Sequence, residues 1–163
     1  MIIEEQKKGR NTMSLFEKVK IYMYTLFNKK WLKGARVYGI PQVYFKNKII
    51  LNKNMTINLN VFLHGAGGIK FGEQVVISYG TSIISTGLDT KGWEKRVVGV
   101  DRHIDEMITI GNNVWLCANV TVLPGVTISD NIVVAAGSVV TGDLLEENSL
   151  YAGVPAKFIK RLD

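Results

Sequence analysis

The second half of the chain carries aliphatic residues at every sixth position. Counted in sixes, the first positions are all aliphatic: Ile110, Leu116, Val122, Ile128, Val134 and Val140. The fifth positions are small or β-branched: Val114, Val120, Val126, Ile132 and Ser138. An earlier stretch has the same spacing at Phe71, Ile77 and Ile83. The two stretches therefore share one structural period, interrupted between them.

A period of six fits neither a helix nor an ordinary hairpin strand. A helix needs apolar residues about every 3.6 positions, and a half-buried strand alternates with a period of two. A period of six instead predicts a coil of short strands joined by tight corners, in which each aliphatic side chain stacks on its equivalent one coil away. Gly and Asn near the corners tolerate positive φ, as in residues 111–113 and at Gly125. We therefore expect an all-β solenoid.

The beginning of the chain has a different pattern. Residues 1–12 read as a poorly ordered polar tail, and residues 13–33 predict one amphipathic helix that starts with a capping-box spacing, Ser14 and Glu17. Its apolar positions recur at helical intervals: Leu15, Phe16, Val19, Tyr22, Met23, Leu26 and Phe27. The favoured interpretation is packing of this face against the chain's own β domain, residues 34–163. Contact with a membrane surface is possible, because the polar side and the helix end carry lysines.

The composition is compatible with one domain that has a continuous core. The chain has 163 residues and a formal net charge of +6, which suits a polyanionic ligand, an anionic surface or nucleic acid about equally. Its single cysteine, Cys117, excludes an internal disulfide and suits a reducing compartment. The sequence has neither a run of about 20 apolar residues nor a signal-peptide core. We therefore expect a cytoplasmic protein.

The hexapeptide register is lost between residues 88 and 107, where charged residues are frequent. We interpret this interval as a loop extruded from the coil. It contains His103, one of only two histidines in the chain, and Trp93.

Residues 108–143 (ITIGNNVWLCANVTVLPGVTISDNIVVAAGSVVTGD), followed by YAGVPAKFIKRL, resemble the C-terminal half of hexapeptide-repeat acetyltransferases, the group that includes galactoside, maltose and serine O-acetyltransferases. The resemblance covers roughly residues 61–162. It implies a left-handed parallel β-helix, a homotrimer, and acetyl-coenzyme A bound between neighbouring subunits. No metal and no nucleic-acid partner are expected.

The family pattern also suggests which residues hold coenzyme A. It carries over to Ala118, Ala136, Thr141 and Lys157, with small residues leaving room for the pantetheine arm. Lys157 and Lys160, with Arg161, could pair with the phosphates. Alternatively, these last three residues form a solvated basic tail.

Acetyl transfer to a hydroxyl needs a base, and histidine suits this role near neutral pH. His103 is the first candidate, because an extruded loop before the ITIG strand often carries the base in this family. Asp101 or Asp105 could orient its ring. His64, which precedes a glycine-rich segment as in serine acetyltransferases, is a second candidate. Galactoside and maltose acetyltransferases place their base a few residues after the third upstream repeat, where this chain has Gly87, Leu88 and Asp89 and therefore lacks that base.

Two other functions are compatible with parts of this sequence. A γ-class carbonic anhydrase shares the coil but needs three histidines for zinc, and this chain has two. A non-enzymatic scaffold remains open but leaves the charged loop unexplained. Three aromatic residues could stack on a sugar ring: Tyr79, Trp93 and Trp115. They could equally fill subunit contacts. On the first interpretation, we expect an O-acetyltransferase whose acceptor is a saccharide. Cys117 lies within a repeat and is interpreted as structural.

Overall fold

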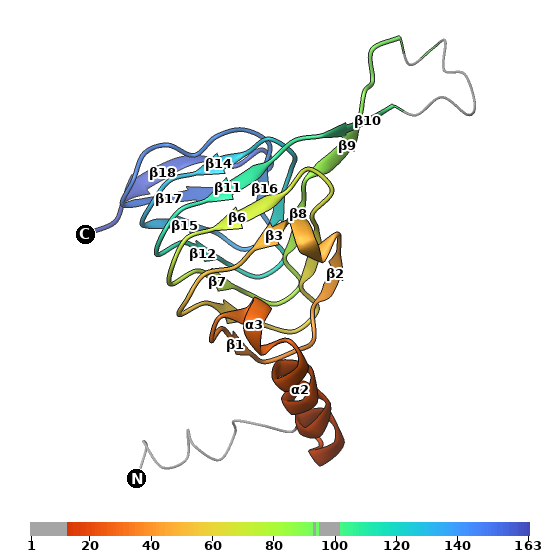
Figure 1. Cartoon of the computed structure of the whole chain (residues 1–163). Helices are drawn as coiled ribbons and strands as arrows, with labels where there is room; N and C mark the ends of the chain where they lie inside the picture. Colours follow the sequence, from red (N-terminus) through yellow and green to blue (C-terminus); the bar gives the residue numbers. More distant parts are fainter. Residues whose placement is uncertain (1–12, 93, 95–101) are drawn as a thin grey trace.

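The structure, a computed structural model, describes residues 13–92, 94 and 102–163. Its main body is a three-sided coil of short parallel strands (Figure 1), and each side is one sheet. Sheet A contains β1 (Arg36–Val37), β4 (Thr56–Ile57), β7 (Val76–Ile77), β12 (Trp115–Leu116), β15 (Ile132–Val134), β17 (Ser149–Ala152) and β18 (Lys157–Arg161). Sheet B contains β2 (Gln42–Tyr44), β5 (Phe62–His64), β8 (Ser82–Ile84), β13 (Thr121–Val122) and β16 (Val139–Val140). Sheet C contains β3 (Ile49–Ile50), β6 (Ile69–Phe71), β11 (Ile108–Ile110) and β14 (Thr127–Ile128), and a short 3-10 helix, η1 (Lys46–Lys48), precedes β3.

The aliphatic ladder forms the interior of the coil. In the uninterrupted part, equivalent residues pair 18 positions apart, as Ile110 does with Ile128 and Leu116 with Val134. One coil is therefore three six-residue units, one for each sheet. All fourteen first and fifth positions named from the sequence are at most 1% exposed. The predicted fold class, a parallel β-solenoid with an N-terminal helix and one extruded loop, is confirmed.

The chain turns between sheets at three columns of corners. At the corner from sheet C to sheet A, Asn113 and Asn131 both adopt positive φ, 52° and 58°, and the side-chain amide of Asn113 donates to Oδ1 of Asn131 at 2.9 Å. Beside them, Oδ1 of Asp130 accepts from the backbone N–H of Asn112 at 2.7 Å, and Oδ2 accepts from its side-chain amide at 2.9 Å. These hydrogen bonds hold the pKa of Asp130 below its ordinary value.

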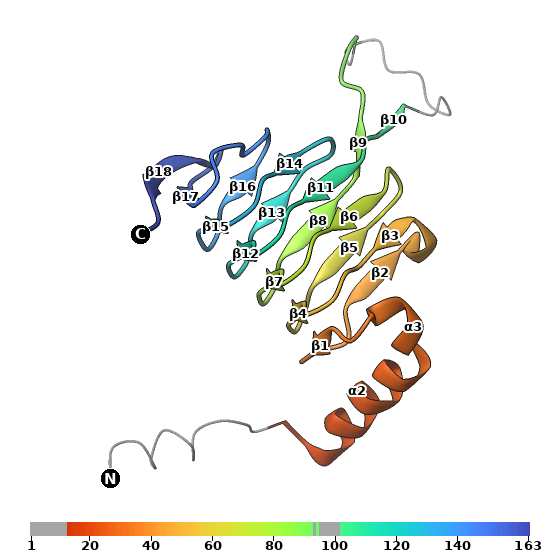
Figure 2. The same ribbon diagram turned by 60° about the vertical axis from the view of Figure 1, so that its left-hand side comes forward.

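The extruded loop leaves the coil at the corner from sheet B to sheet C. It begins after β8 as β9 (Thr86–Leu88) and returns as β10 (His103–Asp105), which pairs antiparallel with β9 before the chain enters β11. Figures 1 and 2 show this hairpin projecting from the side of the coil.

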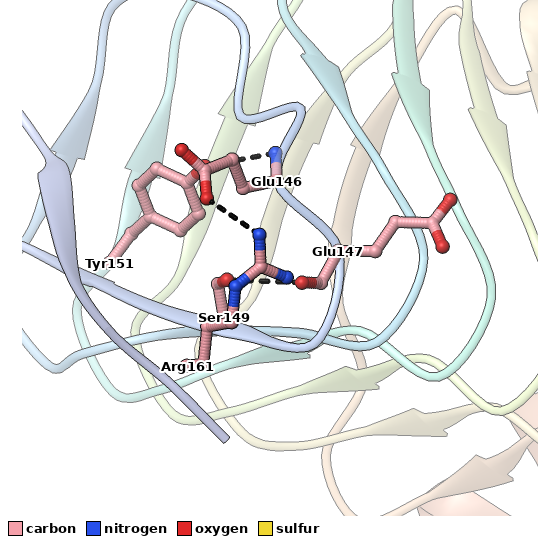
Figure 3. A network of polar contacts seen from close by, with 5 residues as sticks. All are labelled: Glu146, Glu147, Ser149, Tyr151 and Arg161. Carbon is pink, nitrogen blue, oxygen red and sulfur yellow. Dashed lines mark hydrogen bonds and ion pairs between the residues drawn. The ribbon is translucent and has the colours of Figure 1, made fainter. Parts of the chain in front are cut away.

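The C-terminal end of the coil is closed by a strand that reverses direction. Strand β18 pairs antiparallel with β17. The guanidinium of Arg161 lies 3.2 Å from the carboxylate of Glu146, whose backbone N–H donates to the Tyr151 hydroxyl at 3.1 Å (Figure 3). Ser149, buried on the same strand as Tyr151, donates its hydroxyl to the carbonyl of Glu147 at 3.0 Å. This network fastens β18 to the last coil.

At the other end, two helices cover the first coil. The short α3 (Lys29–Leu32) inserts Leu32, which is 1% exposed, and the indole N–H of Trp31 donates to the carbonyl of Ile49 at 3.0 Å. The longer α2 (Leu15–Phe27) begins with the predicted capping box between Ser14 and Glu17. No residue of α2 is buried.

The favoured interpretation of the helix is therefore wrong in one respect. The seven apolar residues that were expected to pack on the β domain are all exposed, from 41% at Met23 to 79% at Phe27. The helix instead turns its other side, with Ile21 and Tyr24, toward the coil. A periodic pattern identifies an apolar face but not which surface covers it. No helix in the described part of the chain is both long and apolar enough to cross a membrane.

Candidate functional site

The stem of the extruded loop holds the first candidate residue, His103. In the antiparallel pair of β9 and β10, His103 lies directly opposite Leu88, and Ile104 lies opposite Gly87. Directly opposed residues of an antiparallel pair project on the same side, with Cβ atoms about 5 Å apart. The imidazole of His103 and the side chain of Leu88, both exposed, therefore share one face of the hairpin.

Charged residues link the two strands of the stem next to the pair of His103 and Leu88, on the side of the loop. The backbone N–H of Asp89 donates to the carbonyl of Arg102 at 2.8 Å, and the Asp89 carboxylate lies 3.9 Å from the Arg102 guanidinium. The guanidinium also donates to the carbonyl of Lys91, whose own N–H donates to Asp89 at 2.9 Å. The two strands are thus tied together at the residue next to His103.

A shallow hollow lies where the stem meets the coil. Its lining comes from both hairpin strands and from the corners of the next two coils: Gly87, Leu88, Ile104, Glu106, Leu123, Pro124 and Thr141. Gly125, with φ of 77°, passes so close that an added Cβ would lie 2.7 Å from Oε2 of Glu106. Thr141, a predicted cofactor residue, therefore lies on the same corner column as the loop that carries His103.

A second group of predicted residues lies at the next corner, between sheets A and B. The register that pairs Val76 with Trp115 and Trp115 with Val133 stacks Tyr79, Ala118 and Ala136 in one column. The backbone confirms this stacking, because Asn119 donates to the carbonyl of Tyr79 at 2.8 Å and Gly137 donates to that of Ala118 at 2.9 Å.

The same column continues to the C-terminal end of the coil. Val139 donates to the carbonyl of Gly153 at 3.0 Å, and exposed Lys157 pairs with Ala152 on β17. Near the other end, Tyr79 is 51% exposed, and its hydroxyl accepts from the side-chain amide of Asn60 at 2.9 Å. Four predicted residues, Tyr79, Ala118, Ala136 and Lys157, thus follow one edge of the coil.

Trp115 and Lys160 share a third surface, the outer face of sheet A. The register aligns Trp115, Val133, Leu150 and Lys160 across neighbouring strands. Trp115 is 50% exposed, as its place in the repeat predicted, and its indole N–H donates to the hydroxyl of Ser78 at 3.0 Å. The indole therefore lies against the coil with a fixed orientation.

His64 lies on the outer face of sheet B, one coil before the loop. Its ring is within 5.2 to 6.2 Å of the rings of Phe45, Tyr44 and Phe62, measured between centroids. Nδ1 is buried and has no hydrogen-bond partner in the described structure. No carboxylate within that structure orients this imidazole, unlike the arrangement typical of a catalytic base.

Among the described residues, none is placed to activate the thiol of Cys117. Burial raises the pKa of its thiol, which disfavours the thiolate. Its carbonyl accepts from the buried Thr81 hydroxyl at 3.0 Å, a contact between successive coils. Across residues 13–92, 94 and 102–163, no group of three or more His, Cys, Asp or Glu side chains could hold a metal ion. Asp101 and Trp93 lie outside the described residues, so their predicted roles stay predictions.

Comparisons with known proteins agree with this architecture. Residues 107–142 match the family described as bacterial transferase hexapeptide (six repeats). A putative lipopolysaccharide biosynthesis O-acetyl transferase of Escherichia coli is 31% identical over 88% of this chain and 87% of its own length. The chain belongs to the hexapeptide-repeat acetyltransferase family.

Other members of the hexapeptide-repeat family are similar over different lengths. The galactoside O-acetyltransferase of Escherichia coli is 35% identical over 80% of this chain, and the match spans only 63% of that relative's length. A galactoside acetyltransferase solved with coenzyme A superposes with a TM-score of 0.71 at 26% identity, covering 94% of this chain and 74% of the other. A Vibrio cholerae hexapeptide-repeat acetyltransferase complexed with acetyl-coenzyme A gives 0.73 at 26% identity, covering 88% and 78%.

The structure adds residues that the hexapeptide pattern did not identify. The pairing of His103 with Leu88, the brace between Asp89 and Arg102, and the position of Glu106 over Gly125 all depend on the loop's stem. The sequence contains one signal for this stem, because the oppositely charged Asp89 and Arg102 lie near the two ends of the non-repeating interval. Such a pair is typical of a hairpin stem.

Proposed function

We propose that this chain is an acetyl-coenzyme A-dependent O-acetyltransferase that transfers the acetyl group directly to a hydroxyl of a saccharide, with His103 as general base. The observation that carries the proposal is the cross-strand pairing of His103 with Leu88. Galactoside and maltose acetyltransferases resemble this chain, and the resemblance places their base near residues 87–89. The hairpin supplies an imidazole from the facing strand at that place.

In the proposed reaction, Nε2 or Nδ1 of His103 removes the proton of the acceptor hydroxyl as its oxygen attacks the thioester carbonyl. The tetrahedral intermediate then collapses, the carbon–sulfur bond breaks, and the departing thiolate receives the proton from the imidazolium. Acetyl ester and free coenzyme A are the products, with no covalent enzyme intermediate. Asp101 remains a proposed orienting group for the ring.

The proposed coenzyme A site uses the column between sheets A and B. Small side chains at Ala118 and Ala136 leave that edge open to a pantetheine arm, and a Cβ added at Gly137 would meet nothing within 4 Å. Lys157 at the end of the column and Lys160 on sheet A are exposed and can pair with phosphates. Two solved members of the family have coenzyme A or acetyl-coenzyme A bound.

The positions of these groups favour a site shared between subunits. Ala118 and His103 belong to neighbouring corner columns, separated by the width of sheet B, or about six residues and roughly 20 Å of extended chain. A base must approach the reacting hydroxyl within hydrogen-bond distance. In the proposed homotrimer, the hairpin of one subunit faces the column of the next, and Thr141 accompanies the hairpin.

The proposed acceptor surface contains Tyr79 and Trp115, together with Trp93 from the loop. Tyr79 and Trp115 are each half exposed and have their polar atoms hydrogen-bonded to Asn60 and Ser78, so their flat faces have fixed orientations. Aromatic faces of this kind stack on sugar rings. Two relatives bear names that refer to galactosides or lipopolysaccharide, which supports a saccharide acceptor.

Replacement of His103 by Ala tests the proposal. The reaction is followed by free-thiol release from acetyl-coenzyme A with the best acceptor from a panel of mono- and oligosaccharides. We expect kcat to fall about 10²–10⁴-fold while calorimetric binding of acetyl-coenzyme A is retained. Turnover close to that of the wild type would contradict the role of His103.

A parallel His64→Ala variant separates the two histidines. We expect it to retain most activity, since the His64 ring is enclosed by aromatic neighbours. A loss as large as that of His103→Ala would favour the alternative, a serine-type acetyltransferase that uses both histidines. Failure of the wild-type protein to bind acetyl-coenzyme A would favour a non-enzymatic scaffold.

A further inference from the structure

The exposed face of α2 is apolar across its whole width. At about 100° per residue, its seven apolar side chains span an arc of roughly 140° with no charged residue inside it. They are Leu15, Phe16, Val19, Tyr22, Met23, Leu26 and Phe27, with exposed fractions from 41% to 79%. Soluble monomers rarely leave so continuous an apolar surface open to water.

The opposite side of α2 faces the coil, and Tyr24 packs against its core. Ile21, Tyr24 and Thr25 on this side are partly buried, and burial raises the pKa of the Tyr24 hydroxyl. Glu17, the acidic residue of the helix, lies on this side near Gly39 and Leu59 of the first coil. The apolar face therefore points away from the coil. Figure 2 shows α2 itself at the end of the molecule beyond β1.

Positive charges border this face and continue past the end of the helix. By helical geometry, Lys18 and Lys20 lie just outside the two edges of the arc, and Nζ of Lys20 is 4.2 Å from the ring centroid of Phe16. Exposed Lys29, Lys30 and Lys33 follow. Lysines beside an apolar stripe can place their stems along it and their ammonium groups in a polar headgroup layer.

The lysines beside the apolar face favour an anionic lipid surface over a second copy of α2 as its partner. A second copy of α2 would bring Lys18 and Lys20 near the same lysines, because Glu17, the acidic residue of the helix, lies opposite the centre of the apolar face. Helix pairs are normally stabilised by opposite charges at these bordering positions, and like charges weaken them. An anionic surface would attract the lysines at both edges of the face.

We propose that α2 is a peripheral membrane-binding helix, which lies in the headgroup region of an anionic bilayer with its apolar face toward the acyl chains. Thirteen residues make a helix of about 20 Å, shorter than the roughly 30 Å needed to span the hydrocarbon core. An amphipathic helix with lysines around an apolar face is typical of interfacial binding. The inference does not depend on the proposed acetyltransferase activity.

Vesicle flotation with the full chain tests this inference. The probes are vesicles of phosphatidylcholine alone and vesicles of phosphatidylcholine mixed with phosphatidylglycerol. We expect the protein to float with the mixed vesicles, to bind the neutral ones much more weakly, and to be released by salt.

Two pairs of variants locate the binding surface. Phe16→Ser with Phe27→Ser removes two exposed rings and should weaken binding at least about tenfold. The matched control is Leu145→Ser with Val154→Ser, which removes side chains that are 61% and 71% exposed elsewhere. Lys18→Glu with Lys20→Glu should weaken binding more than about fivefold for each lysine. Its control, Lys53→Glu with Lys70→Glu, makes the same change in net charge elsewhere on the coil.

The outcomes are separable. Supportive results are loss of flotation in both α2 variants with unchanged melting temperature and unchanged mass in solution, and normal flotation of both controls. The inference is overturned if the wild-type chain does not float, or if the α2 variants float as well as their controls. It is also overturned if Phe16→Ser with Phe27→Ser lowers the mass in solution, because a second copy then covers the face.

Discussion

The two corners at the ends of sheet B are built from the same six-residue unit but differ in what they carry. Between sheets A and B the corners stack without interruption, and small residues such as Ala118 and Ala136 repeat along a straight edge. Between sheets B and C the stack is interrupted by a hairpin whose stem presents His103 beside Leu88. The regular corner supplies a uniform surface along which an extended ligand can lie. The interrupted corner presents an imidazole, proposed as the base, that no repeat could place.

Subunit mixing tests whether the two corners work together across chains. At an acetyl-coenzyme A concentration well below the wild-type KM, where both variants turn over slowly, co-expression of His103→Ala chains with Ala136→Trp chains should give a rate above that of either variant alone. In randomly mixed homotrimers about a quarter of the sites would combine an intact hairpin with an intact corner. The rate at this low acetyl-coenzyme A concentration should therefore be about a quarter of the wild-type rate, at least 25-fold above that of His103→Ala alone. If the activity of the mixture is no higher than the average of the two single variants, then His103 and Ala136 of the same chain form one site.

Blocking the regular corner should act on cofactor binding. In Ala136→Trp the indole would fill the edge at which the pantetheine arm is expected. We predict a KM for acetyl-coenzyme A raised about tenfold or more, with a smaller change in kcat. Lys70→Trp, on an exposed position of sheet C, should leave both constants near their wild-type values. Equal effects of the two substitutions would contradict the proposed cofactor edge.

Loosening the interrupted corner should act on the catalytic step. Asp89→Ala removes the carboxylate that braces the stem against Arg102. We expect kcat to fall about two- to tenfold because His103 is held less firmly, with KM for acetyl-coenzyme A unchanged. The ion pair is partly exposed and contributes below about 1 kcal/mol to stability, so thermal unfolding should barely move. A change confined to KM would argue against a positioning role.

The third corner, between sheets C and A, provides the smallest effect and a pH dependence. The pKa of Asp130 is lowered in the folded state, so its carboxylate stabilises the fold above the carboxyl's ordinary pKa. This contribution is lost as the pH falls through the folded-state value. Asp130→Asn should therefore lower stability at neutral pH by less than about 1 kcal/mol, since the group is largely solvated. Thermal melts of both proteins should converge in acid, and a difference that persists there would contradict this explanation.

The coil could be predicted from the sequence because its environment repeats. Each first position, from Ile110 to Val140, meets the same interior and the same neighbours one coil away, so one pattern determines all of them. The outward direction of Trp115 followed from the same register. The column of Tyr79, Ala118 and Ala136 was also implicit in it, since residues at equal repeat positions must stack.

The rest of the candidate site lies where the repeat stops. The pairing of His103 with Leu88 depends on how two strands of a loop align, and no periodic signal fixes that alignment. The surroundings of His64 likewise depend on Tyr44 and Phe45 from the previous coil. For α2, the sequence identified an apolar face correctly, but its orientation was decided by contacts of the opposite side with the first coil.

Strand β18 runs opposite to the other strands of sheet A. In a stack of parallel coils, the last coil has unpaired backbone donors and acceptors like those that pair every earlier coil with the next. An uncovered end could therefore pair with another molecule, and repeated pairing would give a fibre. Because β18 folds back on β17, and Arg161 is held by Glu146, the pattern is broken after the last turn. The reversed direction of this five-residue strand therefore disfavours end-to-end growth of the coil.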